Sequence, residues 1–108
     1  MLNSVTSVLE RRLTITETHH TPPYEAGWAL EAVLFVQAEG AHPPLRLQPE
    51  MSPDGLSWVP LQPATVLGAE ENITGLNLRH FGGWLRLTLA GATPASPATV
   101  LIHLALKG

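Results

Sequence analysis

Prolines and glycines interrupt this chain so often that long helices have little room to form. Ten prolines and nine glycines are spread over 108 residues, whereas a helix of average length needs ~10 or more uninterrupted residues. Between them, apolar and polar residues often alternate, which is typical of half-buried β-strands. The sequence therefore predicts an all-β fold: an antiparallel β-sandwich, jelly-roll-like or immunoglobulin-like, with about seven to eight strands.

The alternating pattern also locates the strands. The expected strands are 11–18, 28–38, 45–51, 56–62, 73–78, 84–90 and 98–107. The run 28–38 is apolar on both faces, which favours a central strand, although its Ala, Leu and Glu residues are also good helix formers. Pro49 and Pro60 lack an N–H group, so each is expected at a sheet edge or a bulge. Residues 19–27 and 63–71 are expected to be loops, and Gly75 to mark an irregularity.

One short stretch predicts a hairpin turn. Residues 52–58 read SPDGLSW. Pro53 presets φ at the second turn position, Asp54 tolerates the third, and Gly55 supplies a positive φ. Together with Ser52, these residues predict a structural corner between two antiparallel strands, in which Asp54 serves turn geometry rather than chemistry.

The length is that of one domain, which we divide into an N-terminal arm, 1–12, and a single β-sandwich domain, 13–108. Only 14% of the residues are charged, below the ~25% of an average globular protein. One interpretation is that copies of the chain, or a larger partner, cover part of the surface. A compact monomer with a Thr-, Gln- and Pro-rich surface explains the composition equally well.

Charge and hydropathy argue against two classes of partner. Six basic residues stand against nine acidic ones, and the arginines are scattered, so a phosphate-binding face and a nucleic-acid partner are not expected. No apolar run approaches the ~18 residues needed to cross a bilayer, so no membrane partner is expected either. The N-terminal residues also lack the pattern of a secretory signal.

The sequence offers no catalytic or cofactor signature. It has no cysteine, no histidine pair at a metal-binding spacing, no nucleophile elbow and no glycine-rich phosphate loop. His19 and His20 are adjacent, so in an extended segment their side chains point to opposite faces. We therefore expect no catalytic residue, no cofactor and no metal site, and hence no enzyme.

Three tryptophans are candidates for core anchors or for contact residues. Trp84 opens a strand whose apolar positions, 85, 87 and 89, face the other way, so it is the best candidate for an exposed contact. Trp58 follows the predicted turn, and a core or interface position is favoured for it. Trp28 begins the long apolar run. A carbohydrate-binding module would use such aromatic side chains as a stacking platform, and this alternative stays open.

The order of motifs over residues 30–108 resembles a known group of proteins. An apolar strand (LEAVLFVQAEG) is followed by PPLRLQPEMSPDGLSWVPL, then by GGWLRLTLAGATP and TVLIHLALKG. This order is similar to small β-sandwich virion proteins of tailed bacteriophages and prophages, in which an S-x-D-G-x-x-W turn precedes a W-L-R-L-type strand. The first 25 residues do not enter the match.

The resemblance implies a head-decoration (cement) protein of the phage virion, made in the host cytoplasm and bound to the capsid surface. Its implied partners are the major capsid protein and copies of itself, as a trimer. Its implied action is to clamp seams between capsid subunits by burying charge-poor surface. A tail or baseplate accessory protein, and a carbohydrate-binding or adhesive module, are the alternatives.

Overall fold

The computed structural model describes residues 3–108, and the described chain forms ten strands and no helix. The strands are β1 (Ser4–Ile15), β2 (His19–His20), β3 (Tyr24–Glu25), β4 (Glu31–Glu39), β5 (Leu45–Ser52), β6 (Val59–Pro60), β7 (Thr65–Leu67), β8 (Ile73–Arg79), β9 (Trp84–Ala90) and β10 (Ala98–Lys107). The all-β prediction is confirmed.

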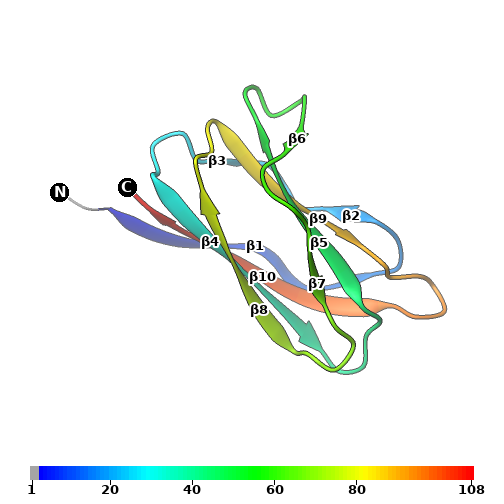
Figure 1. The fold of residues 1–108 in the computed structure, drawn as a ribbon. Coiled ribbons are helices and arrows are strands. Elements are labelled where there is room, and N and C mark those ends of the chain that lie inside the picture. Colours follow the sequence, from blue (N-terminus) through cyan, green and yellow to red (C-terminus); the bar gives the residue numbers. More distant parts are fainter. Residues whose placement is uncertain (1–2) are drawn as a thin grey trace.

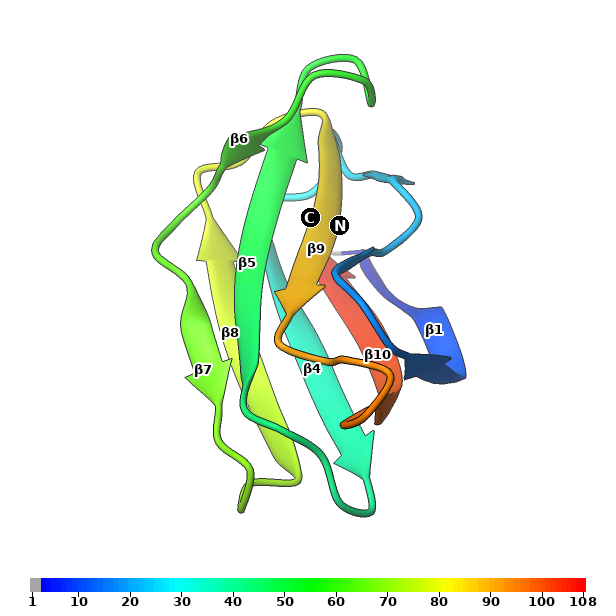
Figure 2. The ribbon, with the colours of Figure 1, turned by 90° about the vertical axis from the view of Figure 1, so that its right-hand side faces the viewer.

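Two antiparallel sheets pack face to face (Figure 1). We call them sheet A, with the order β1-β10-β4-β8, and sheet B, with the order β2-β9-β5-β6. Strand β3 also pairs with β9, and β7 also pairs with β5. If β2 and β3 count as one interrupted strand, and β6 and β7 as another, the eight strand positions have the order of a jelly roll. Figure 2 shows sheet B from its outer side, with β5 and β9 at its centre.

The core is built from the alternating apolar positions of the long strands. On β9 the leucines at 85, 87 and 89 are at most 1% exposed, and on β10 every second side chain from Ala98 to Leu106 is buried. Leucines of β5 and β8 complete the layer between the sheets. This regular burial explains why the sequence pattern places β9 and β10 correctly.

The first strand begins earlier than the sequence predicts. Residues 4–12, expected as a separate arm, form most of β1 and pair with β10 at the edge of sheet A. The boundary between 12 and 13 therefore does not separate an arm from the domain; Met1 and Leu2 lie outside the described residues. The alternation is obscured because the pairing register shifts after Val8 and again after Glu10. Such bulges break the period of two.

The run 28–38 is a strand, as predicted, but only from Glu31 onwards. Ala32, Leu34 and Val36 are buried, whereas Trp28 and Leu30 precede the strand and are exposed. The alternation of apolar and polar residues already begins in the segment 28–30, so the sequence alone predicts a strand that starts too early.

The second sheet contains pieces that the sequence misses. The expected loops 19–27 and 63–71 hold β2, β3 and β7, and the expected strand 56–62 shrinks to β6. Pro60 lies in that edge strand, whereas Pro49 is buried in the interior strand β5. The pairing with β7 ends at Leu47 and the pairing with β6 begins at Glu50. The missing N–H of Pro49 therefore falls in the gap between two short edge strands. Gly75, expected as an irregularity, pairs in regular register with Phe35.

Candidate functional site

The turn at 52–55 connects β5 to the segment that leads into β6. The Ser52 Oγ atom accepts hydrogen bonds from the backbone N–H groups of Asp54 (3.2 Å) and Gly55 (2.8 Å). The Asp54 carboxylate accepts two more, from the N–H groups of Leu56 (2.8 Å) and Ser57 (2.9 Å). Gly55 has a φ of 80°. The N–H groups of Ser57 and Leu56, with the Ser52 hydroxyl, lower the pKa of Asp54 below its ordinary value of 3.8. All of these polar groups are engaged within the turn.

Two of the three tryptophans lie beside this turn on the outer face of sheet B. Trp84 is half-buried, and its ring lies 3.4 Å from where a Cβ atom on Gly55 would be. Trp58 is also half-buried, and the Arg86 guanidinium carbon lies 4.4 Å from the centroid of its ring. A cation over a ring face is a favourable contact. Each tryptophan therefore already has a packing partner within the chain.

The outer face of sheet B also carries a connected polar network. The Arg86 Nε atom donates to Glu50 Oε1 at 2.6 Å, and the Thr88 hydroxyl donates to the same oxygen at 2.6 Å. The His20 Nδ1 atom lies 2.7 Å from Thr88 Oγ1. The centre of this face is polar, and its side chains bond to one another. Exposed valines lie on the edge strands β6 and β7 of sheet B, at Val59 and Val66. The two adjacent histidines lie apart as expected, since His19 contacts Glu10 and His20 contacts Thr88.

The third tryptophan lies at the same end of the sandwich, in the loop between β3 and β4, where the Ala26 N–H donates to the Gly83 carbonyl. Trp28 is 42% exposed and packs beside Gly108, at the end of the chain. Leu30, nearby, is 78% exposed. The three tryptophans that the sequence singles out therefore have three different packing partners within the chain: Gly55 for Trp84, Arg86 for Trp58 and Gly108 for Trp28.

Within residues 3–108, no group of three His, Asp or Glu side chains gathers closely enough to hold a metal ion. The described residues also include no helix that could cross a membrane. His42 is buried, and its ring nitrogens lie 2.8 Å from the Pro43 carbonyl oxygen and 2.7 Å from the Glu71 carbonyl oxygen.

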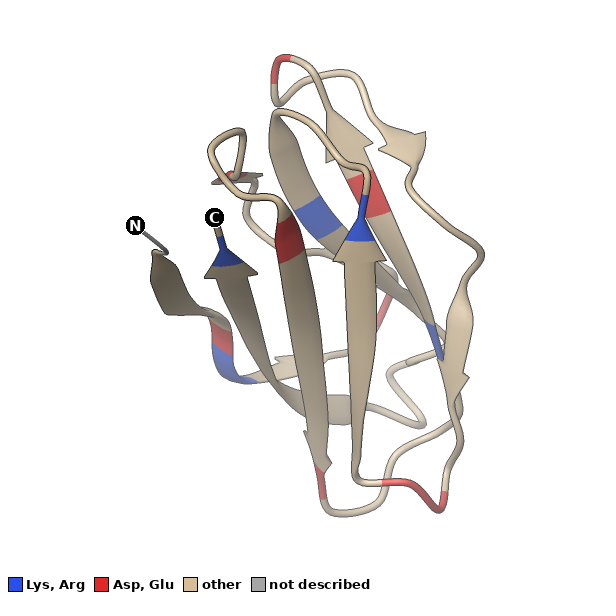
Figure 3. Ribbon diagram, turned by 60° about the vertical axis from the view of Figure 1, so that its left-hand side comes forward, with Lys and Arg blue, Asp and Glu red and all other residues tan. Residues whose placement is uncertain are grey.

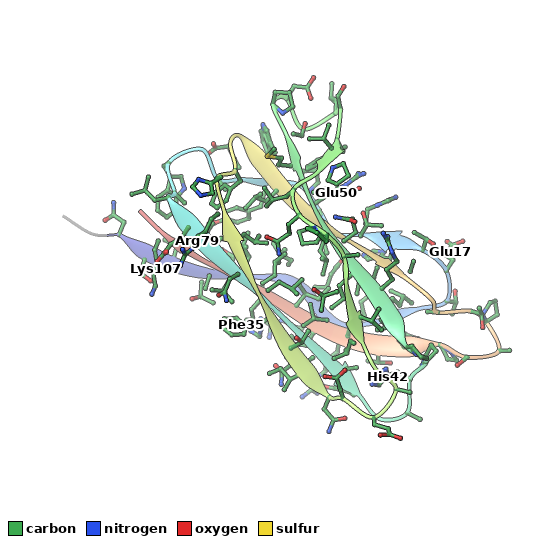
Figure 4. All side chains as sticks on the ribbon, in the orientation of Figure 1. Glu17, Phe35, His42, Glu50, Arg79 and Lys107 are labelled. Carbon is green, nitrogen blue, oxygen red and sulfur yellow. The ribbon has the colours of Figure 1, made fainter. Side chains whose placement is uncertain are left out.

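The outer face of sheet A is different in character. Its central rows contain only apolar and uncharged polar side chains together with one histidine, as the register shows: Val8, His103, Phe35 and Gly75 in one row; Thr6, Ala105, Val33 and Asn77 in the next. In β4, β8 and β10 the charged residues lie at the ends of the strands, among them Glu31, Arg79 and Lys107 at one end (Figure 3). In β1 they lie in the middle of the strand, at Glu10, Arg11 and Arg12. Phe35 is 39% exposed. Figure 4 shows Phe35 and Glu50 on opposite outer sides of the sandwich.

The edges of the two sheets also differ. Sheet B ends in strands of only two or three residues, with prolines in or between them: Pro22, Pro23, Pro60 and Pro63. Short edges and prolines are devices that prevent pairing with another chain. Sheet A ends in β1 and β8, which have 12 and 7 residues and contain no proline. Their segments 4–9 and 73–78 carry no charge either.

Sequence analysis missed this pair of edges. The segments SVTSVL and ITGLNL contain the signal, since each is a proline-free, uncharged β-forming run. Strand order cannot be read from the pattern, however, so the sequence does not reveal that both segments end the same sheet.

No protein-family model matches the sequence, and no curated protein matches it either. A search of solved structures does find similar folds. A chain from Bacillus endospore appendages, which form disulfide-linked pili, matches with a TM-score of 0.65 and 10% identity over 99% of this chain and 85% of that one. A family two carbohydrate esterase from Cellvibrio japonicus matches with a TM-score of 0.51 and 14% identity. This chain spans all of its own length but only 34% of the esterase.

At these identities the two likenesses establish the β-sandwich fold alone. Neither solved structure is a phage head protein, so the resemblance to virion proteins stays a prediction. This chain has no cysteine, so it cannot form the disulfide links for which the Bacillus appendages are described.

Proposed function

We propose that this protein is a structural subunit that acts by assembling with copies of itself and with a larger protein lattice, and that it has no catalytic role. The observation that carries the proposal is the contrast between its two outer faces. The centre of sheet B presents polar side chains that bond to one another, whereas sheet A presents a charge-poor face between two edges whose segments 4–9 and 73–78 contain no proline and no charge. Unprotected edges and exposed apolar rows are features of surfaces that bind other chains.

In its finer form, the proposal is that the lattice is a phage head and that the protein is a capsid decoration protein. The order of motifs over residues 30–108 supports this form. The clamping action requires a broad charge-poor face, and the central rows of sheet A offer one across β1, β10, β4 and β8. A tail or baseplate accessory protein would use the same face on a different lattice.

The experiment is co-sedimentation of the purified protein with empty capsids made from the major capsid protein of the phage or prophage that carries its gene. We expect saturable binding, with a fixed ratio of copies to capsid subunits. Phe35→Lys should weaken that binding, whereas the matched change Val66→Lys, at an exposed valine of β7 in sheet B, should not. Absence of binding at saturating protein would contradict the decoration role.

A carbohydrate-binding function is the second candidate, because Trp84 and Trp58 lie with the polar network on one face of sheet B. Arg86 and Gly55 already cover part of those rings, which weakens this candidate. Glycan-array binding that is lost in Trp84→Ala would favour it over the structural role.

A further inference from the structure

We infer that copies of this protein join edge to edge, with β8 of one copy pairing antiparallel to β1 of the next, so that sheet A continues from copy to copy. The inference rests on the proposed structural function and specifies its self-association. The partner of each free edge is a second copy of this chain. Four features of the structure lead to it.

The first feature is strand direction. In sheet A, β1 is antiparallel to β10, β10 to β4, and β4 to β8, so β1 and β8 run in opposite directions. A copy displaced sideways within the plane of the sheet therefore places its β1 antiparallel to β8 of the first copy. No rotation of the copy is required beyond the natural twist of the sheet.

The second feature is the match of side chains. If the rows of sheet A continue without a shift, Gly75 lies opposite Val8 of the next copy, and Asn77 lies opposite Thr6. On the inner side, Leu78 then lies opposite Val5. This register keeps the core-facing positions of both strands on the same side of the sheet, as the pleat demands.

The third feature is that Gly75, which has no side chain, lies beside the exposed ring of Phe35. A Cβ atom on Gly75 would lie 3.7 Å from the Phe35 ring, so Phe35 covers the glycine on the outer face. Aromatic rings beside an edge glycine compensate for its missing side chain. Phe35 and Val8 are 39% and 41% exposed, and the pairing would bring these two apolar side chains into contact across the junction.

The fourth feature is the position of the β1 residues that prevent pairing with another strand. The later part of β1 has two register shifts, a positive φ of 48° at Arg12, and the charges of Glu10, Arg11 and Arg12. Bulges and charges of this kind prevent pairing. They leave the regular segment 4–8 as the part of the edge that can pair, and in this register it lies opposite residues 75–79 of β8, of which only Arg79 is charged.

Pairing between two unlike edges always leaves free edges on the assembly. The copy at one end of a row keeps a free β1 edge, and the copy at the other end keeps a free β8 edge. The contact is therefore heterologous, and further copies can add at both ends. Because neighbouring strands are rotated by roughly 20–25° and spaced ~4.8 Å apart, each added four-stranded copy would advance the assembly by roughly 19 Å and turn it. A twisted, open row of copies follows.

The test uses two variants that each block one edge. Val8→Lys places a charge on the β1 edge, and Gly75→Lys places one on the β8 edge, where there is room for the side chain. Sedimentation velocity of the wild type over a concentration series should show a growing series of oligomers. Each variant alone should stay monomeric, with a dissociation constant raised at least tenfold. Val66→Lys is the control and should behave as the wild type; circular dichroism verifies that all variants fold.

The decisive sample is a mixture of the two blocked variants. The Val8→Lys copy keeps a normal β8 and the Gly75→Lys copy keeps a normal β1, so the mixture should form a 1:1 heterodimer and nothing larger. Three results would overturn the inference: a wild type that stays monomeric up to about 1 mM, a regime in which even weak contacts are occupied; a Val8→Lys variant that dimerises by itself; or a mixture that fails to pair. Capsid binding by a chain that does not self-associate would overturn this inference alone. Self-association without capsid binding would overturn the decoration role alone.

Discussion

At the scale of single residues, the structure assigns the polar groups of the turn at 52–55 to holding the backbone. Asp54 accepts bonds from the N–H groups of Leu56 and Ser57, and Ser52 is 1% exposed beneath them. The sequence predicted the turn and the geometric role of Asp54. It did not predict that Trp84 packs on Gly55, because that contact joins positions distant in the chain.

Asp54 makes a pH-dependent contribution to stability. Its pKa is lowered in the folded protein by the N–H groups of Ser57 and Leu56, so its stabilising effect is complete above the unfolded pKa and is lost as the pH falls through the folded pKa. Thermal melts of the wild type and Asp54→Ala should show a lower Tm for the variant at pH 7. The gap between them should shrink below about pH 4. A gap that is constant down to pH 2 would contradict this role.

Gly83 occupies a position that only glycine can fill. It has a φ of 72°, and a Cβ atom there would lie 2.3 Å from the Ser52 carbonyl oxygen. Gly83→Ala should therefore lower the free energy of unfolding by more than ~1 kcal/mol. Its neighbour Gly82 has open space around its Cβ position, so Gly82→Ala is the matched control. Urea denaturation measures the free energy of unfolding of both variants. An equal loss of stability in the two would contradict the predicted clash at Gly83.

At the scale of elements, strand prediction succeeds where one face of a strand is buried along its whole length. This holds for β9 and β10, whose alternation is uninterrupted. It fails for β2, β3 and β7, which are too short to show a period. It also fails at the start of β1, where bulges shift the phase. Neither the pairing of edges nor the packing partners of the three tryptophans are encoded locally, because both depend on contacts between distant parts of the chain.

Thr21 illustrates how a short element is held. It lies between β2 and β3, is 2% exposed, and bonds Leu87 twice: its N–H donates to the Leu87 carbonyl, and its hydroxyl oxygen accepts from the Leu87 N–H. Thr21→Val keeps the volume but leaves that N–H without an acceptor, which should cost about 1–3 kcal/mol of stability. The exposed Thr18→Val is the control, expected within about 0.5 kcal/mol of the wild type in the same denaturation experiment.

At the scale of the whole molecule, the two outer faces divide the surface by chemistry. On the outer face of sheet B, the side chains of four residues contact one another: Trp58, Arg86, Glu50 and Thr88. Sheet A joins an uncharged row of Val8, Phe35 and Gly75, with His103 among them, to two edges without proline. The low charge content suggested a covered surface, and the structure locates the surface that best fits this idea. The trimer expected from the phage resemblance stays a prediction.

The central claim is that assembly uses sheet A, and hydrogen–deuterium exchange at low and high protein concentration tests it directly. Edge amides that gain a partner strand become protected. The account predicts that edge amides within residues 4–8 and 75–79 slow markedly at high concentration, while those around Trp58 and Trp84 on sheet B do not change. Protection that appears around the two tryptophans instead, or exchange that is independent of concentration at both edges, would contradict it.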